Sequence, residues 1–465
     1  MFLPIILALW LGLALAFLLL HFFGKQELPN LPPGNMGWPI LGETIGFLKP
    51  HKSNSIGSFL QEHCSRYGRI FKSHLFGSPT IVSCDHELNM FILQNEEKLF
   101  QASYPKPMHD ILGKHSLLMV SGDIHKKIRS FAVSFVGISK SSPEFLHSVE
   151  TLTISMMDSW RNCKAVSFYK EAKVFALNTM MKHLLSIKPE EPIASTILED
   201  FETFMTGFVS LPLKIPGSAY AKAVKARARL SSTVKGIITE REQRNVGVTG
   251  GDFLDGILSN PSLSYDEKIS IVLDLLLAGY ETTATLMALI VYFLGHAPNA
   301  LEKLKEEHQG IRKCKEEGET LNWADYKKME FTSNVICEAM RCGNVVKFVH
   351  RKALQDIRFK EFVIPSGWKV FPILTAVNFD ATLHENPLEF NPWRWFDEST
   401  SKKVSPFGGG PRLCPGAELA KVEIAYFLHH LVLNYRWKTK ADDYPLAHPY
   451  VQFRRGLLLE IDPIE

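Results

Sequence analysis

The sequence lacks close cysteine pairs: none of its 7 cysteines forms a CxxC motif, and their number is odd. Such a pattern argues against a disulfide scaffold and against a structural zinc site. The default expectation for a cysteine in this setting is a small buried hydrophobic residue. Cys414 departs from that expectation because of the residues around it.

An excess of charge of one sign is also absent. The chain of 465 residues has 52 Lys and Arg against 49 Asp and Glu, a net charge of +3. This balance provides no general electrostatic attraction to nucleic acid. No Gly/Ser-rich, Gln-rich or charged tract divides the sequence, and no repeat occurs at solenoid periods. We therefore predict one large catalytic domain, residues 41–465, behind a short N-terminal segment.

The N-terminal segment contains no Asp, Glu, Lys or Arg over residues 2–23. An apolar run of this length spans a bilayer core of about 30 Å. A cleaved signal peptide is the alternative, but it would have a basic start, a shorter apolar stretch and a small-residue cleavage site. We expect a transmembrane anchor at residues 1–24 and a proline-rich, semi-rigid linker at residues 25–40. With Lys25 on the cytosolic side, the catalytic domain would face the cytosol.

Hydrophobic periodicity predicts a mainly helical domain with small β-sheets at its edges. Residues 57–75 are expected to be helical, and residues 80–83 to form a strand. Two later segments, 359–364 and 368–373, flank a Pro-Ser-Gly sequence and predict a hairpin. A further helix is expected after Cys414.

A long apolar helix is predicted near the centre of the chain. Ser264 and Glu267 fit an N-terminal capping box ahead of an apolar run at residues 271–293. Asp274 and Glu281 interrupt the run, and each would cost about 2.5–3.5 kcal/mol at the middle of a bilayer. A buried helix that crosses the domain is therefore preferred to a second membrane span.

The middle of this helix has an unusual composition. Ala278 and Gly279 are small, and Glu281, Thr282 and Thr283 bring an acid and two hydroxyls beside them. Glycine in a helix interior costs about 1 kcal/mol relative to alanine, and adjacent hydroxyls compete for backbone carbonyls. One interpretation is a groove lined by groups that handle protons. The other is a close helix crossing at the glycine with satisfied threonines.

The most specific pattern surrounds Cys414. Three glycines, the last of them Gly410, precede Arg412 and Cys414, and Gly416 leads into a helical pattern. Glycines allow the backbone to approach a flat ligand closely. The start of a helix stabilises an anion and lowers the pKa of a thiol, and a thiolate is a good ligand for iron. Arg412 is expected to reach a carboxylate at the rim of that ligand.

This segment matches the haem-binding signature F-x-x-G-x-R-x-C-x-G of the cytochrome P450 family at Phe407, Gly410, Arg412, Cys414 and Gly416. The central helix resembles the family motif A-G-x-[DE]-T-T. Two further family motifs, E-x-x-R and P-x-x-F-x-P-x-R-[FW], lie between them in the family's order. The resemblance covers the chain from the anchor to the C-terminus. It implies the cytochrome P450 fold and a haem b whose iron is bound by the thiolate of Cys414.

The resemblance also implies roles for further residues. Glu281 would feed protons, and Thr282 would position the bound oxygen and its water. A network of Glu338, Arg341 and Arg394 would hold the core near the haem. The expected contacts to the haem propionates are Arg412, Arg129, Arg351 and, at a position where the family has tryptophan, His125.

The chain contains no convincing flavin or nicotinamide domain, so electrons must come from a partner. The resemblance implies an NADPH-dependent cytochrome P450 reductase at the endoplasmic reticulum membrane and reductive activation of O₂. A P450-fold isomerase or dehydratase and a non-catalytic haem protein are the alternatives. Glu281 and Thr282 speak against both, and the uninterrupted loop before Cys414 also speaks against an isomerase or dehydratase.

The substrate is indicated by more detailed similarity. The loop around Cys414 and the segments 341–346 and 386–395 resemble plant enzymes of brassinosteroid biosynthesis, in particular steroid C-22 hydroxylases. This implies hydroxylation of the side chain of a campesterol-like sterol, although related enzymes oxidise triterpenoids or other sterols. The expected pocket walls, for which core packing is the alternative, are Leu275, Ala278, Gly279, Val345, Val346, Phe348 and Val451.

Overall fold

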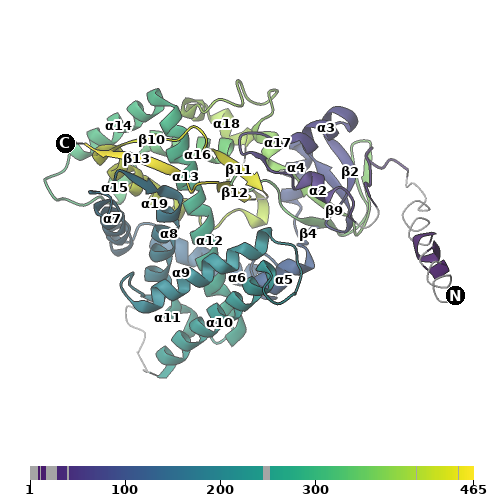
Figure 1. Cartoon of the computed structure of the whole chain (residues 1–465), viewed down its shortest axis with the longest axis horizontal. Coiled ribbons are helices and arrows are strands. Elements are labelled where there is room, and N and C mark those ends of the chain that lie inside the picture. Colours follow the sequence, from purple (N-terminus) through teal and green to yellow (C-terminus); the bar gives the residue numbers. More distant parts are fainter. Residues whose placement is uncertain are drawn as a thin grey trace. The chain divides into compact units, whose positions relative to one another are not determined.

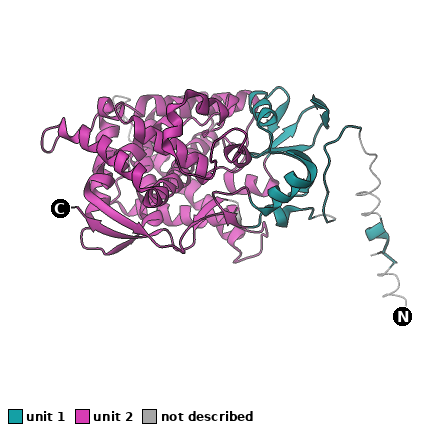
Figure 2. Ribbon diagram, turned by 90° about the horizontal axis from the view of Figure 1, so that it is seen from above, with its two compact units in different colours: residues 1–49, 57–103, 348–373 teal, residues 50–56, 104–347, 374–465 magenta. Residues whose placement is uncertain are grey.

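The computed structural model describes residues 9–10, 12–16, 29–38, 41–243, 252–404, 406–448 and 450–464. The chain forms two compact units (Figure 2). Unit 1 comprises Met1–Lys49, Gly57–Ser103 and Phe348–Ile373, and unit 2 comprises Pro50–Ile56, Tyr104–Lys347 and Leu374–Glu465. Each unit has its own hydrophobic core.

Unit 1 is built on a five-stranded sheet with the strand order β2-β3-β9-β6-β4. Strands β3 and β9 run parallel, and the other neighbours are antiparallel. A separate ladder joins β7 to β8. The elements of unit 1 are α2 (Thr44–Phe47), α3 (Ser58–Tyr67), β2 (Ile70–Leu75), β3 (Ser78–Ser83), α4 (His86–Gln94), β4 (Phe100–Ala102), β6 (Arg351–Ala353), β7 (Ile357–Phe359), β8 (Phe362–Ile364) and β9 (Lys369–Pro372).

Unit 2 is mainly helical (Figure 1). Among its described residues, two small sheets have the orders β1-β11-β12 and β10-β13-β5. The prediction of a helical protein with small sheets is therefore confirmed. The helices are α5 (Lys106–Leu112), α6 (Gly122–Ser139), α7 (Pro143–Asp158), α8 (Phe168–Leu185), α9 (Pro192–Met205), η1 (Thr206–Val209), α10 (Ala219–Gln243), α11 (Phe253–Leu258), α12 (Tyr265–Ala278), η2 (Gly279–Thr283), α13 (Ala284–His296), α14 (Pro298–Lys313), α15 (Trp323–Tyr326), α16 (Glu330–Gly343), α17 (Leu374–Asn378), η3 (Pro392–Phe396), α18 (Glu398–Lys403), η4 (Gly410–Arg412) and α19 (Ala417–Asn434). The strands are β1 (His51–Lys52), β5 (Ala165–Ser167), β10 (Tyr435–Thr439), β11 (Pro445–His448), β12 (Tyr450–Phe453) and β13 (Leu458–Pro463).

A continuous helix, Tyr265–His296, combines α12, η2 and α13. Its predicted capping box is confirmed, because Ser264 Oγ accepts from the Glu267 N–H while the Glu267 side chain accepts from the Ser264 N–H. In its middle, η2 forms one π-helical turn, a feature that is frequent at functional sites. By length and composition this helix could cross a membrane, but 61% of its most apolar window is buried inside the protein. It is therefore a core helix.

Two local predictions are wrong. Residues 57–75 do not form one helix, because α3 ends before Gly68, whose φ is +90°, and β2 follows. The segments on either side of residues 365–367 do not pair with each other. Instead β8 pairs with β7 across a turn in which Lys360 has a φ of 51°, while β9 pairs with β3 and β6. In both places a residue with positive φ reverses or ends the element.

Most of the predicted anchor, residues 1–24, lies outside the described residues, as do residues 25–28 and 39–40 of the predicted linker. Residues 9–10 and 12–16 are helical and exposed. The described part of the linker is tied to unit 1 by backbone hydrogen bonds from Val363 N–H to the Asn30 carbonyl and from Lys72 N–H to the Pro33 carbonyl, both 2.8 Å long. This part of the linker therefore belongs to unit 1.

Candidate functional site

The segment before α19 places Cys414 next to the start of that helix. Gly408 and Gly410 have φ angles of 78° and 64°, a region that favours glycine, so the chain turns sharply there. The Cys414 N–H then donates to the Phe407 carbonyl at 3.0 Å and closes the loop. Gly416 is the N-cap residue of α19, so the thiol lies two residues before the cap.

The Cys414 thiol is accessible but strongly desolvated. The residue is accessible, yet burial raises the pKa of its thiol, against the lowering effects of the Gly416 N–H and the charge of Arg129. The thiol therefore keeps accessible surface although protein atoms surround it on most sides. Desolvation therefore outweighs the favourable contacts at the helix terminus.

Two cations lie beside this cysteine. The guanidinium of Arg129, from α6, donates through Nη2 to the Leu413 carbonyl. Burial lowers the pKa of Arg129, the charge of Cys414 opposes that effect, and the charge of Arg412 adds to it. The two arginines and the thiol are therefore within electrostatic reach of one another. His125, one helical turn before Arg129, is buried.

Arg412 is held by the segment between α5 and α6. Its Nη2 donates to the Val120 carbonyl at 2.6 Å, and its Nη1 donates to the Leu117 carbonyl at 3.3 Å. The guanidinium thus connects the loop that carries Cys414 to the residues just before α6.

One face of the central helix is accessible although the helix lies in the core. Residues 269–291 are otherwise almost entirely buried. At 3.6 residues per turn, positions four and eight apart share a face. Ala278 and Thr282 are the two exposed residues of this stretch. We call the accessible positions on this face the accessible stripe, which consists of Asp274, Leu277, Ala278, Glu281 and Thr282.

These residues fit an iron porphyrin. Cys414 offers a soft sulfur ligand, and Arg129 and Arg412 offer cations for carboxylates at the rim of the ring. The η2 segment, which carries Thr282, contacts α19, which follows the cysteine loop. Ala278 contributes only a methyl group to the accessible stripe, so a flat ligand meets little steric resistance there. The donor set is that of a haem-thiolate centre.

Glu281 is held by residues of α8. Lys173 Nζ lies 3.1 Å from Glu281 Oε2, and the Tyr169 hydroxyl donates to Glu281 Oε1 at 2.9 Å. The same hydroxyl is 2.9 Å from Thr285 Oγ1. Burial and the charge of Glu281 raise the pKa of Tyr169. Thr282 instead donates to a carbonyl of its own helix at 2.6 Å. The predicted acid and hydroxyl are therefore neighbours in sequence but have separate partners.

Tyr169 and Lys173 were not predicted as functional residues. They lie four residues apart on α8, so their spacing indicates only that they share a helix face. Their pairing with Glu281 depends on how α8 packs against η2.

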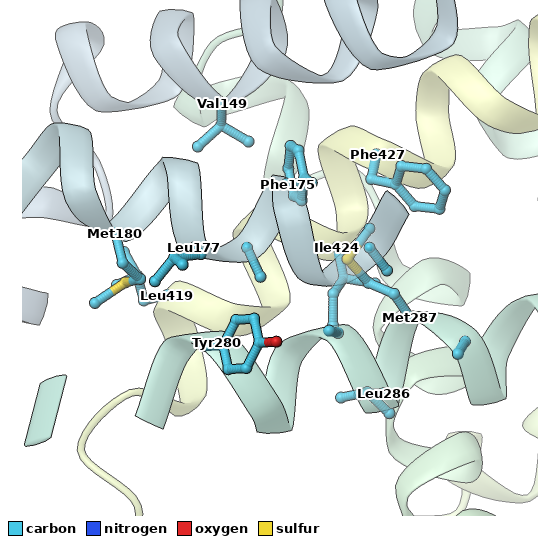
Figure 3. Packing of buried hydrophobic residues seen from close by; sticks show 14 of the residues in the cluster. Val149, Phe175, Leu177, Met180, Tyr280, Leu286, Met287, Leu419, Ile424 and Phe427 are labelled. Atoms are coloured by element: carbon cyan, nitrogen blue, oxygen red, sulfur yellow. The ribbon is translucent and has the colours of Figure 1, made fainter. Parts of the chain in front are cut away.

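Gly279 faces α8. A Cβ atom at this position would lie 2.4 Å from Cγ and 2.7 Å from Sδ of Met180. Figure 3 shows Met180 of α8 and Tyr280 of η2 among the buried side chains of this region. The geometry favours the interpretation of Gly279 as a close helix crossing. Its predicted place beside the substrate stays a prediction.

Gly279→Ala is expected to destabilise the protein by about 1–3 kcal/mol, because the new methyl group overlaps Met180. Met180→Ala removes the obstructing atoms, so the double variant should be more stable than the sum of the two single losses predicts. Denaturant unfolding of the four proteins measures this coupling. Gly310→Ala, in a helical position with nothing near its Cβ, is the control and should not destabilise. Strict additivity at Gly279 and Met180 would contradict the steric explanation.

A buried ion network connects α16 with the segment around η3. Glu338 and Arg341 are fully buried, and Arg341 donates to both carboxylate oxygens of Glu338 at 2.9 and 2.8 Å. Arg394 Nε donates to Glu338 Oε1 at 2.9 Å. The Asn391 N–H and the Trp395 indole N–H complete the set, each at 2.9 Å. The structure thus brings the three predicted residues together. Trp395 was not predicted, although it ends the P-x-x-F-x-P-x-R-[FW] motif.

Three other predicted residues have different partners. Arg351 is buried in unit 1, where its Nε lies 2.5 Å from Glu96 Oε2. Phe348, also in unit 1, packs against Phe47 with ring centroids 5.0 Å apart. Val451 is buried in β12. The observed contacts are those of ion pairing and core packing, and the predicted roles of these residues at the haem or substrate stay predictions.

The remaining predicted wall residues of unit 2 differ in accessibility. Leu275 is buried in α12 with 9% of its surface exposed, whereas Val346 is 48% exposed after the end of α16. Val345 is half-buried. Val346 and Ala278 are therefore the apolar wall candidates with the most free surface.

Comparisons with known proteins agree with this geometry. The family model named Cytochrome P450 matches residues 32–464. The chain is 56% identical to cytochrome P450 724B1 of Oryza sativa subsp. japonica, over 98% of this chain and 97% of that protein. It is 45% identical to cholesterol 22-monohydroxylase CYP90B52 of Paris polyphylla, over 94% of each chain. It is 42% identical to a steroid (22S)-hydroxylase of Oryza sativa subsp. japonica, over 95% of this chain and 89% of that protein.

A solved structure is also similar. Retinoic acid-bound cyanobacterial CYP120A1 superposes with a TM-score of 0.85 at 26% sequence identity, covering 94% of this chain and 100% of that one. The likeness therefore extends over nearly the whole chain.

Proposed function

This chain belongs to the cytochrome P450 family, and on that premise we propose that it hydroxylates the side chain of a sterol at C-22. Its class, a haem-thiolate monooxygenase, follows from the family match over residues 32–464. The observation that carries the finer proposal is the identity of 45% and 42% to plant enzymes named for hydroxylation of cholesterol or a steroid at position 22. A campesterol-like precursor of brassinosteroids is the proposed substrate.

Several residues of the chain would have separate roles around the haem. When bound, the haem supplies activation of O₂ and oxidation of an unreactive C–H bond. Cys414 would hold the iron through its sulfur, and the hydrogen bond from its N–H to Phe407 keeps the loop closed. Arg129 and Arg412 would pair with the haem carboxylates. Thr282 would place its hydroxyl beside the reacting atoms, and Ala278 would leave room for the substrate.

Glu281 would deliver protons toward Thr282. Its contacts with Lys173 and Tyr169 hold the carboxylate at the end of a polar chain that reaches Thr285. A carboxylate in this position accepts a proton from one neighbour and passes it to another, whereas an amide does not.

Glu281→Gln is therefore expected to lower kcat by about 10²-fold while KM changes little, because proton delivery and not substrate binding is lost. Steady-state kinetics with a reductase measure both constants. Asp266→Asn replaces an exposed acid on the same continuous helix and is the control, which should leave kcat and KM unchanged. An unaltered kcat in Glu281→Gln would remove Glu281 from the proposed proton path.

The partner and location are also part of the proposal. Electrons would come from NADPH through an NADPH–cytochrome P450 reductase. Residues 1–24 would anchor the protein in the endoplasmic reticulum membrane, with the catalytic domain at residues 41–465 in the cytosol. The uncharged segment at residues 2–23 and Lys25 after it support this topology.

The test is reconstitution of the full chain with a plant NADPH–cytochrome P450 reductase, followed by mass spectrometry and NMR of the products. Campesterol and cholesterol should give NADPH-dependent products hydroxylated at C-22. Hydroxylation at another carbon, or turnover of triterpenoids alone, would reject the proposed position or substrate. NADPH-independent rearrangement of a lipid hydroperoxide would indicate an isomerase instead.

A further inference from the structure

An acid lies at one end of the accessible stripe. Asp274 is one helical turn before Ala278 and two turns before Thr282, so the three positions share one face of the central helix. The intervening residues Leu275 and Leu276 are buried, whereas Asp274 keeps part of its surface accessible. The helix therefore presents a carboxyl group, a methyl group and a hydroxyl group in line.

The surroundings of Asp274 are nevertheless those of an interior group. Burial raises the pKa of Asp274 to about 7, and hydrogen bonds from Leu117 and Ser116 and the charge of Arg227 act in the opposite direction. Accessible surface together with strong desolvation is the same combination that Cys414 shows. Asp274 thus keeps accessible surface although protein atoms of unit 2 surround it.

The contacts of Asp274 leave room for another donor. The Leu117 N–H donates to Asp274 Oδ2 at 2.6 Å, and the Ser116 hydroxyl also bonds to the carboxylate. A carboxylate has about four lone-pair sites for hydrogen bonds. Arg227, from α10, contributes its charge while its Nη2 donates to the Leu112 carbonyl at 3.3 Å. A hydroxyl that enters the accessible stripe would find an acceptor here.

The spacing along the helix matches a sterol. Eight residues at 1.5 Å each place Asp274 about 12 Å from Thr282 along the helix axis. This is comparable to the length of the fused rings of a sterol, which carry a hydroxyl at one end and the side chain at the other. The surface between the two positions, at Leu277 and Ala278, is apolar, as rings require.

We propose that Asp274 accepts a hydrogen bond from the ring hydroxyl of a sterol whose side chain lies beside Thr282. This inference rests on the proposed function, since it assumes a sterol oxidised in its side chain. It assigns Asp274 a part in substrate specificity, because a substrate without the hydroxyl leaves the remaining acceptor site of the carboxylate without a donor.

Asp274 also has a positioning effect that must be separated from recognition. Leu117 donates its N–H to Asp274 and accepts from Arg412 through its carbonyl, so Asp274 helps to fix the residues beside the cysteine loop. Loss of that positioning effect alone would weaken the binding of every substrate to the same extent. Loss of the hydrogen bond to the ring hydroxyl would weaken the binding only of substrates that carry this hydroxyl.

The experiment compares cholesterol with 3-deoxycholesterol, the same molecule without its hydroxyl. Binding to the full-length ferric holoenzyme is followed by the change in haem absorption, so turnover is not needed. The parent should bind cholesterol about tenfold or more tightly than 3-deoxycholesterol. In Asp274→Ala this ratio should fall to about one, and Asp266→Asn, an exposed acid on the same helix, should keep the parental ratio.

Each other outcome overturns the inference. If Asp274→Ala weakens the binding of both sterols equally, Asp274 only positions the loop, and the proposed function stands. If the parent does not distinguish the two sterols, the hydroxyl has no partner of this kind. If the parent binds neither sterol, the proposed function fails together with the inference. Should Asp274→Ala not retain haem, Asp274→Val, which is closer in size to aspartate and has no acceptor, is tested by the same ratio of affinities.

Discussion

Cys414→Ala is expected to abolish monooxygenase activity while the protein stays folded. The substitution removes the sulfur that the loop presents next to α19 and leaves the hydrogen bond from residue 414 N–H to Phe407 intact. A thiolate ligand is what gives the reduced, carbon monoxide-bound haem of this family its strongly red-shifted Soret band. The parent protein, expressed without residues 1–25, should show that band, and Cys414→Ala should lack it.

The control for this measurement is Cys163→Ala. Cys163 is also an exposed cysteine, and its sulfur bonds only weakly to the Ser159 carbonyl at 3.6 Å. Its replacement should leave the spectrum and the turnover unchanged. A red-shifted band that persists in Cys414→Ala would show that another group binds the iron, and the assignment of Cys414 would fail.

Features fixed by short sequence spacings could be predicted. The helix after Cys414, observed as α19, was predicted from residues within a few positions of Cys414. The capping box at Ser264 and Glu267 has the same local origin. The pairing of Glu338 with Arg341 needs only helical geometry, since positions three apart share a face. In each case the chemistry and the partner lie within a few residues of each other.

Features that depend on packing between distant segments could not be predicted. Glu281 has its partners Tyr169 and Lys173 on α8, more than 100 positions away in the chain. Arg351 pairs with Glu96, which no spacing rule connects to it. Buried charges need partners, but the sequence does not indicate which partner the fold supplies.

The prediction of strand pairing failed for a similar reason. The alternation of side chains identified a strand at β9, but its neighbours are β3, in parallel, and β6. A short turn after β8 made a local hairpin the simplest expectation. The partner of a strand is selected by which apolar face completes the core of unit 1, including Ile81 and Val370. That information is spread over the whole unit.

Arg341→Met is expected to cost about 3–5 kcal/mol of stability, because it removes the main partner of a fully buried carboxylate. Arg341 also donates to the carbonyls of Asn378 and Pro387, each at 2.7 Å, so these acceptors lose their donor as well. Thermal unfolding and haem retention measure the loss. Lys303→Met, which breaks an exposed pair with Glu306, is the control and should cost about 0–1 kcal/mol. Equal losses in the two variants would refute the proposed importance of burial.

The pH dependence of this loss gives a second readout. Burial alone would raise the pKa of Glu338, but hydrogen bonding and the charges of Arg341 and Arg394 hold it below its ordinary value of 4.5. The stability that Glu338 contributes is therefore fully present above pH 4.5 and is lost as the pH falls through the lower folded-state pKa. In Arg341→Met, fewer contacts oppose the effect of burial on the pKa of Glu338, so this pKa is higher than in the parent. Glu338 then takes up a proton at a higher pH, and the cost of burying its charge disappears. The difference in unfolding free energy between parent and variant should thus be largest near neutral pH and shrink on acidification, whereas a loss caused by packing alone would not change with pH.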